Sequence, residues 1–181
     1  MATFRRATVA GGTYFFTLAT YCRRPLLTLP EIVTATGHAI RSVRAEFPFE
    51  LVAMVLLPDH LHAIWTLPPD DADYPRRWAV IKTHIATEAR RFVTVPLTRS
   101  MAKRHETGVW QRRYWEHLIR DDVDLQRHVD YIHINPVKHG YVKHVADWPH
   151  STFHRYVKRG IRPRDWAAEV ASGQFGEVAQ P

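Results

Sequence analysis

The chain lacks the cysteines that build disulfides and cysteine-based zinc clusters, and the long apolar runs that build membrane spans. Its 181 residues include a single cysteine, Cys22, which excludes an intramolecular disulfide and a cysteine-based zinc cluster. No apolar run is long enough to cross a bilayer, and the first ten residues lack the apolar stretch of a signal peptide. There is no internal repeat. We therefore expect a cytoplasmic protein without a membrane partner.

Positive charge and aromatic rings are abundant instead. There are 25 Lys and Arg residues against 18 Asp and Glu, which gives a net charge of +7. Basic pairs recur, often beside an aromatic residue: Arg23-Arg24, Arg76-Arg77, Arg90-Arg91, Lys103-Arg104 and Arg112-Arg113. Cations next to stacking rings are typical of sites for single-stranded nucleic acid. For any one pair, a solvated basic surface around core aromatics explains the pattern equally simply.

The hydrophobic pattern predicts seven elements in one domain. Strands are expected over 13–21, 51–57, 61–67 and 114–119, and helices over 30–47 and 78–92 and from about 121 to 135. Pro136 should end or kink the third helix, because the residue before a proline is pushed out of helical dihedrals. This order suits an α+β domain of ferredoxin-like or RRM-like type, with a central antiparallel sheet and helices packed on it.

Two segments fall outside these elements. Residues 94–108 show no clear period and should form a long basic loop. The domain is expected to cover residues 1–166, and residues 167–181 should form a loosely ordered tail.

The first candidate site is the histidine pair His60 and His62 at the start of the strand 61–67. Side chains alternate across a strand, so both imidazoles project from one face and Leu61 from the other. Two adjacent imidazoles form half of a site for a divalent metal. Two polar residues at a strand start are the alternative, and the pattern alone leaves both open.

The second candidate is the pair Tyr131 and Asn135 in the expected third helix. A spacing of four places both on one helical face. A tyrosine can attack a phosphodiester when its proton is removed with help, and an asparagine oxygen suits Mg²⁺ or Mn²⁺ beside two histidines. Taken alone, the helix favours a core tyrosine and an asparagine in the turn before Pro136.

A resemblance changes that balance. Several stretches look like those of the REP-associated tyrosine transposases, which are relatives of the transposases of small single-strand insertion sequences: Gly11–Thr17, Leu57–His62, Trp115–His117, Asp130–Gly140 and Asp147–His154. The resemblance runs from about Arg5 to Trp166, and the motifs keep the family's order. It implies that His60 and His62 are metal ligands, that Tyr131 is the nucleophile, and that Asn135 is the third ligand. Wider relatives have glutamine there, so the shorter Asn135 acts directly or through a water.

The resemblance also implies partners. These are single-stranded and hairpin DNA, specifically REP palindromes with a conserved tetranucleotide on the 5′ side. It further implies a monomer that works at the bacterial nucleoid. Candidate DNA contacts are the basic residues Arg5, Arg6, Arg23, Arg24, Arg76, Arg77, Lys82, Arg112, Arg113, Lys138 and His139. Other histidines are expected in packing, phosphate contacts or the surface: His117, His128, His133, His139 and His144.

The implied reaction is a metal-assisted transesterification in which Tyr131 forms a 5′-phosphotyrosine and releases a 3′-hydroxyl. Two other functions stay open at this point. One is a non-catalytic RRM-like module that binds single-stranded nucleic acid. The other is a metal-dependent phosphodiesterase that activates water and leaves no covalent adduct.

Overall fold

The computed structural model describes residues 8–94, 97–104 and 106–167. Within them, four strands are β1 (Thr13–Ala19), β2 (Glu50–Leu56), β3 (His60–Thr66) and β4 (Trp115–Leu118). Three long helices are α1 (Pro30–Glu46), α2 (Tyr74–Phe92) and α4 (Asp122–Lys138). Shorter helical segments are η1 (Tyr21–Arg23), α3 (Arg99–Lys103), η2 (Val145–Asp147) and α5 (Phe153–Lys158).

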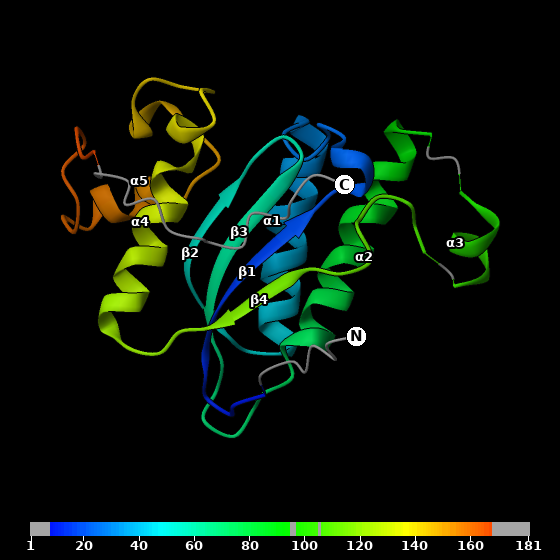
Figure 1. The fold of residues 1–181 in the computed structure, drawn as a ribbon, viewed down its shortest axis with the longest axis horizontal. Helices are drawn as coiled ribbons and strands as arrows, with labels where there is room; N and C mark the ends of the chain where they lie inside the picture. Colours follow the sequence, from blue (N-terminus) through cyan, green and yellow to red (C-terminus); the bar gives the residue numbers. More distant parts are fainter. Residues whose placement is uncertain (1–7, 95–96, 105, 168–181) are drawn as a thin grey trace, which may run out of the picture.

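The strands form one antiparallel sheet in the order β2-β3-β1-β4. Along the chain, the main elements follow one another as strand, helix, strand, strand, helix and strand. Together with the sheet order, this succession is the ferredoxin-like arrangement. Figure 1 shows α1 and α2 side by side behind the sheet and α4 at its β2 side. The α+β fold that the sequence predicts is confirmed.

One face of the sheet carries the larger core. Tyr14, Phe16 and Trp65 point to this side and pack with Trp78 of α2. The rings of Trp65 and Trp78 are stacked with centroids 4.1 Å apart. The spacing of Trp78, Ile81, Ile85 and Phe92 predicts a buried stripe on α2; the first three are buried, but Phe92, the last residue of the helix, is 51% exposed.

The other face of the sheet packs against α4. Phe15 and Ile64 contact a smaller cluster that includes Tyr131 and Ile132 of α4. His62 also belongs to this face, because its ring lies 5.4 Å from that of Phe15, centroid to centroid. The sheet therefore has one side dominated by packed aromatic and aliphatic side chains and one side on which a histidine is buried among the apolar residues.

The α4 helix differs from expectation at its C-terminal end. Instead of ending at Asn135 and Pro136, it continues to Lys138. Proline removes one helical hydrogen bond, but the loss falls in the last turn, where the N–H of His139 still donates to the oxygen of Asn135 at 3.0 Å. Asn135 consequently stays on the helix, one turn after Tyr131.

Smaller differences occur elsewhere. The strand expected to reach Tyr21 ends at Ala19, and Cys22 and Arg23 then take φ values of 54° and 52°, which turns the chain. The segment expected as a long basic loop contains the short helix α3. At the start of α4, Asp121 caps the helix: its carboxylate accepts a hydrogen bond from the backbone N–H of Asp124.

Two expectations concern the membrane and the tail. Among the helices that the structure describes, none combines the length and apolar character of a membrane span. Residues 168–181, which make up nearly all of the expected tail, lie outside the described residues.

Candidate active site

The histidine pair lies at the start of β3, an inner strand of the sheet. Leu61 packs in the core on the α1 and α2 side, while the rings of His60 and His62 lie on the α4 side, 5.0 Å apart between centroids. Both histidines are buried. The alternation expected from the sequence thus places two imidazoles next to each other on one face.

Each histidine is held through its Nδ1 atom. Nδ1 of His62 lies 2.8 Å from Oγ1 of Thr17, and Nδ1 of His60 lies 2.6 Å from Oδ1 of Asp59. Arg23 in turn pairs with the other oxygen of Asp59, its Nε being 2.9 Å away. A bond to one ring nitrogen fixes the orientation of the other, which is how ligands of a metal are commonly positioned.

Sequence reasoning missed both of these partners. Thr17 is far from His62 along the chain and becomes its neighbour only through the antiparallel register of β1 and β3, which pairs the two residues directly. In the sequence, Asp59 follows Pro58 and fits a turn between two strands. Its position directly before His60 was the available signal.

Tyr131 approaches the histidines from α4. Its side chain is 2% exposed, and its ring is edge-on to that of His62 with centroids 5.2 Å apart. The ammonium of Lys138 lies 5.1 Å from the centre of the tyrosine ring. Tyr131 and the histidine pair therefore share one side of the sheet, in one chain.

Asn135 is fully buried, one helical turn after Tyr131. Among the described residues, neither atom of its amide group has a hydrogen-bond partner, and the same is true of Nε2 of His62. Each buried polar group without a partner costs about 1–3 kcal/mol. Two imidazoles with oriented rings and a buried, unsatisfied amide are suitable ligands for a divalent metal ion.

The ionisation states suit this interpretation. Burial lowers the pKa of His62 well below its usual range, and the charge of His60 lowers it further. The ring of His62 is therefore neutral near pH 7, as a metal ligand must be. Burial raises the pKa of Asp59, but the hydrogen bond and charge of His60 and the charge of Arg23 outweigh it, and the net pKa is lowered.

The candidate DNA contacts divide into three groups. Arg23, Lys138 and His139 border the site, since the ring of His139 lies 5.2 Å from that of His60. Two others, Arg76 and Lys82, belong to α2 on the far side of the sheet. Of the rest, Arg24 directly follows η1, and Arg112 and Arg113 are exposed before β4. Arg5 and Arg6 lie outside the described residues.

The expectation that Arg77 contacts DNA requires a correction. Its side chain is 2% exposed and donates to the carboxylate of Asp71 and to the backbone oxygens of Phe47, Pro48 and Asp73. An arginine with its donors engaged inside the protein cannot contact a phosphate, so it stabilises the fold instead.

Two aromatic residues that stand beside basic pairs in the sequence, Trp78 and Trp110, are buried. For them, core packing explains the pattern better than stacking on bases. The indole N–H of Trp110 donates to the backbone oxygen of Lys82 at 3.1 Å. These rings belong to the core and offer no face to an unpaired base.

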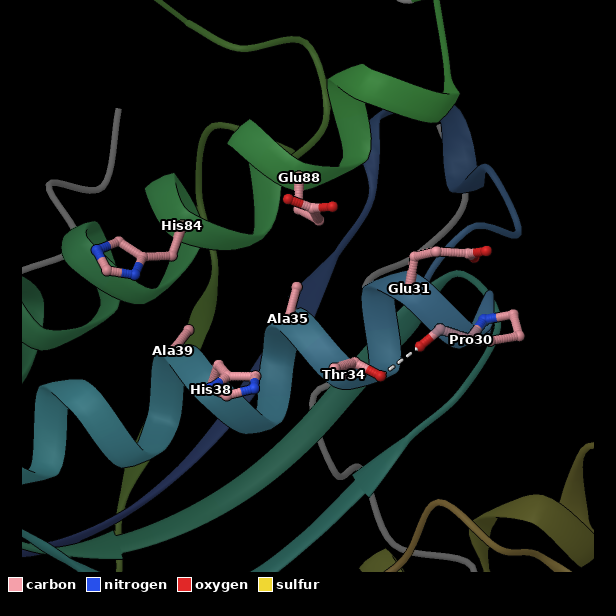
Figure 2. A pocket seen from close by; sticks show the side chains of 8 residues that line it. All are labelled: Pro30, Glu31, Thr34, Ala35, His38, Ala39, His84 and Glu88. Carbon is pink, nitrogen blue, oxygen red and sulfur yellow. Dashed lines mark hydrogen bonds between the residues drawn. The ribbon is translucent and has the colours of Figure 1, made fainter.

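A groove of about 600 Å³ lies away from the histidine pair. Figure 2 shows that it is lined by side chains of α1 and α2, among them His38 and His84. These helices cover the face of the sheet opposite α4. The groove is therefore separate from the candidate active site.

The fold and the site define a class of enzyme: an α+β domain in which a buried helical tyrosine faces a histidine pair on a central strand. No family model matches the chain. A REP-associated tyrosine transposase of Escherichia coli is 45% identical over 180 residues, which is 98% of each protein. A relative in Haemophilus influenzae, assigned to the same family, is 45% identical over 92% of this chain and 93% of its own length.

A solved structure agrees with these relatives. It is that of a REP-associated tyrosine transposase bound to a REP hairpin, with a TM-score of 0.83 and 43% identity over the whole of both chains. The present chain belongs to the REP-associated tyrosine transposases, which are DNA-cleaving and DNA-joining enzymes.

Proposed function

We propose that this protein cleaves and rejoins single-stranded DNA at REP-type palindromes, through a covalent bond between Tyr131 and a 5′-phosphate. The observation that supports this most directly is the contact between Tyr131 and His62, with an unsatisfied amide of Asn135 one turn further along the same helix. We assign the activity to one domain over residues 1–166, acting as a monomer.

The proposed step is a transesterification. The phenolic oxygen of Tyr131 loses its proton and attacks the scissile phosphorus, and the bond from phosphorus to the 3′-oxygen breaks. That oxygen takes up a proton and leaves as a 3′-hydroxyl. One phosphodiester replaces another, so a 3′-hydroxyl can reverse the step and join new ends.

The neighbouring residues have defined parts in this scheme. Mg²⁺ or Mn²⁺, held by His60, His62 and Asn135, would supply positive charge to the scissile phosphate. Thr17 and Asp59 hold the two imidazoles in place. The ammonium of Lys138, 5.1 Å from the centre of the Tyr131 ring, places positive charge beside the attacking residue, where it can hold a phosphate of the DNA.

The substrate follows from the relatives and the local charge. A relative of nearly identical fold is bound to a REP hairpin, and Arg23, Lys138 and His139 place basic side chains around the site of this chain. We infer that they hold the phosphates of a hairpin with single-stranded flanks. Such DNA lies at the nucleoid of the bacterial cytoplasm, where we expect the protein to act.

The two alternative functions fit less well. An RRM-like module binds nucleic acid on an open sheet surface, but Phe15, in the centre of this sheet, is completely buried on the α4 side. A hydrolase that activates water gives no part to a tyrosine packed against a metal-binding histidine.

Tyr131→Phe tests the proposal, with Tyr141→Phe as the control. Tyr141 is the matched tyrosine, because its ring stacks on His139 at 5.8 Å and it is more exposed than Tyr131. The parent and Tyr141→Phe should give a covalent DNA–protein band on a denaturing gel and a phosphotyrosyl peptide that contains Tyr131. Tyr131→Phe should bind hairpin DNA as tightly as the parent and form no adduct.

The alternatives give different results in the same assay. Cleavage by Tyr131→Phe without an adduct would indicate the water-activating hydrolase. DNA binding without cleavage in all three proteins would indicate the non-catalytic module. Loss of one hydroxyl should lower stability by no more than about 1 kcal/mol, so misfolding does not confuse the outcome.

A further inference from the structure

A second cluster of metal-binding side chains lies where β4 meets the start of α4. His117 belongs to β4, and Asp124 and His128 lie four residues apart on the first turns of α4, so both point to the same side. Nε2 of His117 is 2.8 Å from one oxygen of Asp124, and Nδ1 of His128 is 3.3 Å from the other. One potential ligand atom from each residue falls within 4.8 Å of the other two.

The chemistry of these groups suits a transition metal. Burial raises the pKa of Asp124, but hydrogen bonds from Arg120 and His117 outweigh it, and the net pKa lies far below its usual range. Burial is also the main cause that lowers the pKa of His128. The cluster therefore holds an ionised carboxylate and a neutral imidazole near pH 7, as metal binding requires.

We propose that His117, Asp124 and His128 form a second divalent metal site, separate from that of His60, His62 and Asn135 and suited to Zn²⁺. Two imidazoles and one carboxylate are a typical set of three protein ligands for zinc, with a fourth position left for water.

The surroundings allow an ion to enter. The side chain of His117 is 26% exposed, which leaves the cluster open to solvent on one side, while Asp124 and His128 are buried. Nε of Arg120 lies 3.0 Å from the carboxylate of Asp124, but the arginine side chain is 69% exposed and can move away. An ion would replace the charge that Arg120 supplies.

Two existing hydrogen bonds must be given up. Nδ1 of His128 donates to the backbone oxygen of Asp124 at 2.8 Å, and Nε2 of His117 lies 2.8 Å from the Asp124 carboxylate. Binding through these two nitrogens needs the tautomers that carry the proton on the other ring nitrogen, so both bonds are exchanged for bonds to the ion.

The position of the cluster gives the ion a structural effect. β4 is a four-residue strand at the edge of the sheet, and α4 carries Tyr131 one turn after His128. Phe15 of β1 connects His128 with Tyr131: its ring centroid lies 4.8 Å from that of His128 and 6.1 Å from that of Tyr131. An ion here would fix the tyrosine helix to the sheet edge.

Zinc stoichiometry, measured on untagged protein by native mass spectrometry and calorimetry, tests the second site. Three double variants are compared with the parent: His60→Ala with His62→Ala, His117→Ala with His128→Ala, and a control, His38→Ala with His84→Ala. The control histidines are exposed and line the groove of α1 and α2 in Figure 2.

The parent and the control should bind two Zn²⁺ ions per chain, and the other two variants should each bind one. The second site is refuted if the His60 and His62 variant binds no zinc, or if the His117 and His128 variant binds as much as the parent. A single ion that is lost only in the His117 and His128 variant would support the second site and argue against the proposed catalytic one.

Two further variants guard against misfolding. His117→Gln changes the most exposed ligand and should keep the parental circular dichroism while it loses one zinc. Arg120→Ala removes a competing cation and should lower the dissociation constant for zinc about threefold, a change that corresponds to the free energy of an exposed ion pair. If the cluster is only an ion-pair network, Arg120→Ala leaves zinc binding unchanged, which would overturn the proposal.

Discussion

The two faces of the sheet are built on different principles. On the side of α1 and α2, rings such as Phe16, Trp65 and Trp78 pack against one another. On the side of α4, the apolar residues share the interior with His62 and Asn135; among the described residues, Nε2 of His62 and both amide atoms of Asn135 lack hydrogen-bond partners. Within the same described part of the chain, the indole nitrogens of Trp65 and Trp78 on the first face also lack partners, but only the second face holds buried imidazole and amide groups that can bind a metal ion.

That difference separates stability from function. A face of packed rings contributes free energy of folding in proportion to the apolar area it buries. A face with buried, unsatisfied nitrogen and oxygen atoms costs free energy until a ligand supplies the missing interactions. We therefore expect substitutions on the two sides to give opposite patterns in activity and stability.

The largest effect on activity should come from the histidine pair. His60→Ala with His62→Ala should reduce cleavage to background and leave hairpin binding intact, because basic side chains hold the strand. EDTA should do the same to the parent. Gel assays of binding and cleavage check this, with His38→Ala and His84→Ala as the control. Full cleavage by the histidine variant would remove the metal from the mechanism.

The largest effect on stability should come from the opposite face. Trp65→Ala leaves a cavity between Trp78 and Phe49 and should lower the free energy of unfolding by about 3–5 kcal/mol. Urea denaturation measures this loss. Activity per folded molecule, assayed at low temperature, should stay near that of the parent. A loss below about 1 kcal/mol would contradict the division between the two faces.

A smaller effect is expected from Thr17→Val, which removes the hydroxyl that holds His62 and keeps the shape of the side chain. Metal affinity and cleavage should fall about 10- to 100-fold, as is usual when the partner of a ligand is lost. Thr13→Val is the matched control: it lies on the same strand and its hydroxyl bonds Thr66 at 2.8 Å, away from the histidines. Equal effects of the two variants would show that the loss is merely structural.

The sequence could predict what depends on local periodicity. Alternation along one strand was enough to place His60 and His62 on the same face, and a spacing of four placed Tyr131 and Asn135 on one side of a helix. The order of strands and helices led to the ferredoxin-like sheet. These features follow from repeats of two and 3.6 residues and need no tertiary information.

Other features depend on contacts between distant segments. The partnership of Thr17 with His62 needs the register of β1 and β3. Arg77 looks like a surface cation in the sequence but is buried by backbone oxygens of the segment after α1. Pro136 was expected to end α4, and only the helix length shows that its missing N–H falls in the last turn. Such outcomes are set by tertiary packing.

The smallest predicted effect concerns the pH dependence of stability. His133 lies on α4 but faces away from Tyr131, with its Nε2 atom 3.1 Å from Oγ1 of Thr152. Burial lowers its pKa to about 3, against an unfolded value of about 6.5. Between these two values the unfolded chain binds a proton that the folded chain does not, so stability is complete above pH 6.5 and is lost as the pH falls.

His133→Gln removes this titration and keeps a polar side chain in the helix. From pH 6.5 to 4.5, above the range in which most carboxylates titrate, the parent should lose up to about 1.4 kcal/mol more per pH unit than the variant. His62, whose pKa is also lowered, contributes in the same direction in both proteins and cancels in the comparison. Urea midpoints at several pH values give the two slopes. Parallel slopes would mean that His133 is already hydrated or protonated in the folded state, and the buried polar side of the sheet would then be less closed than its geometry indicates.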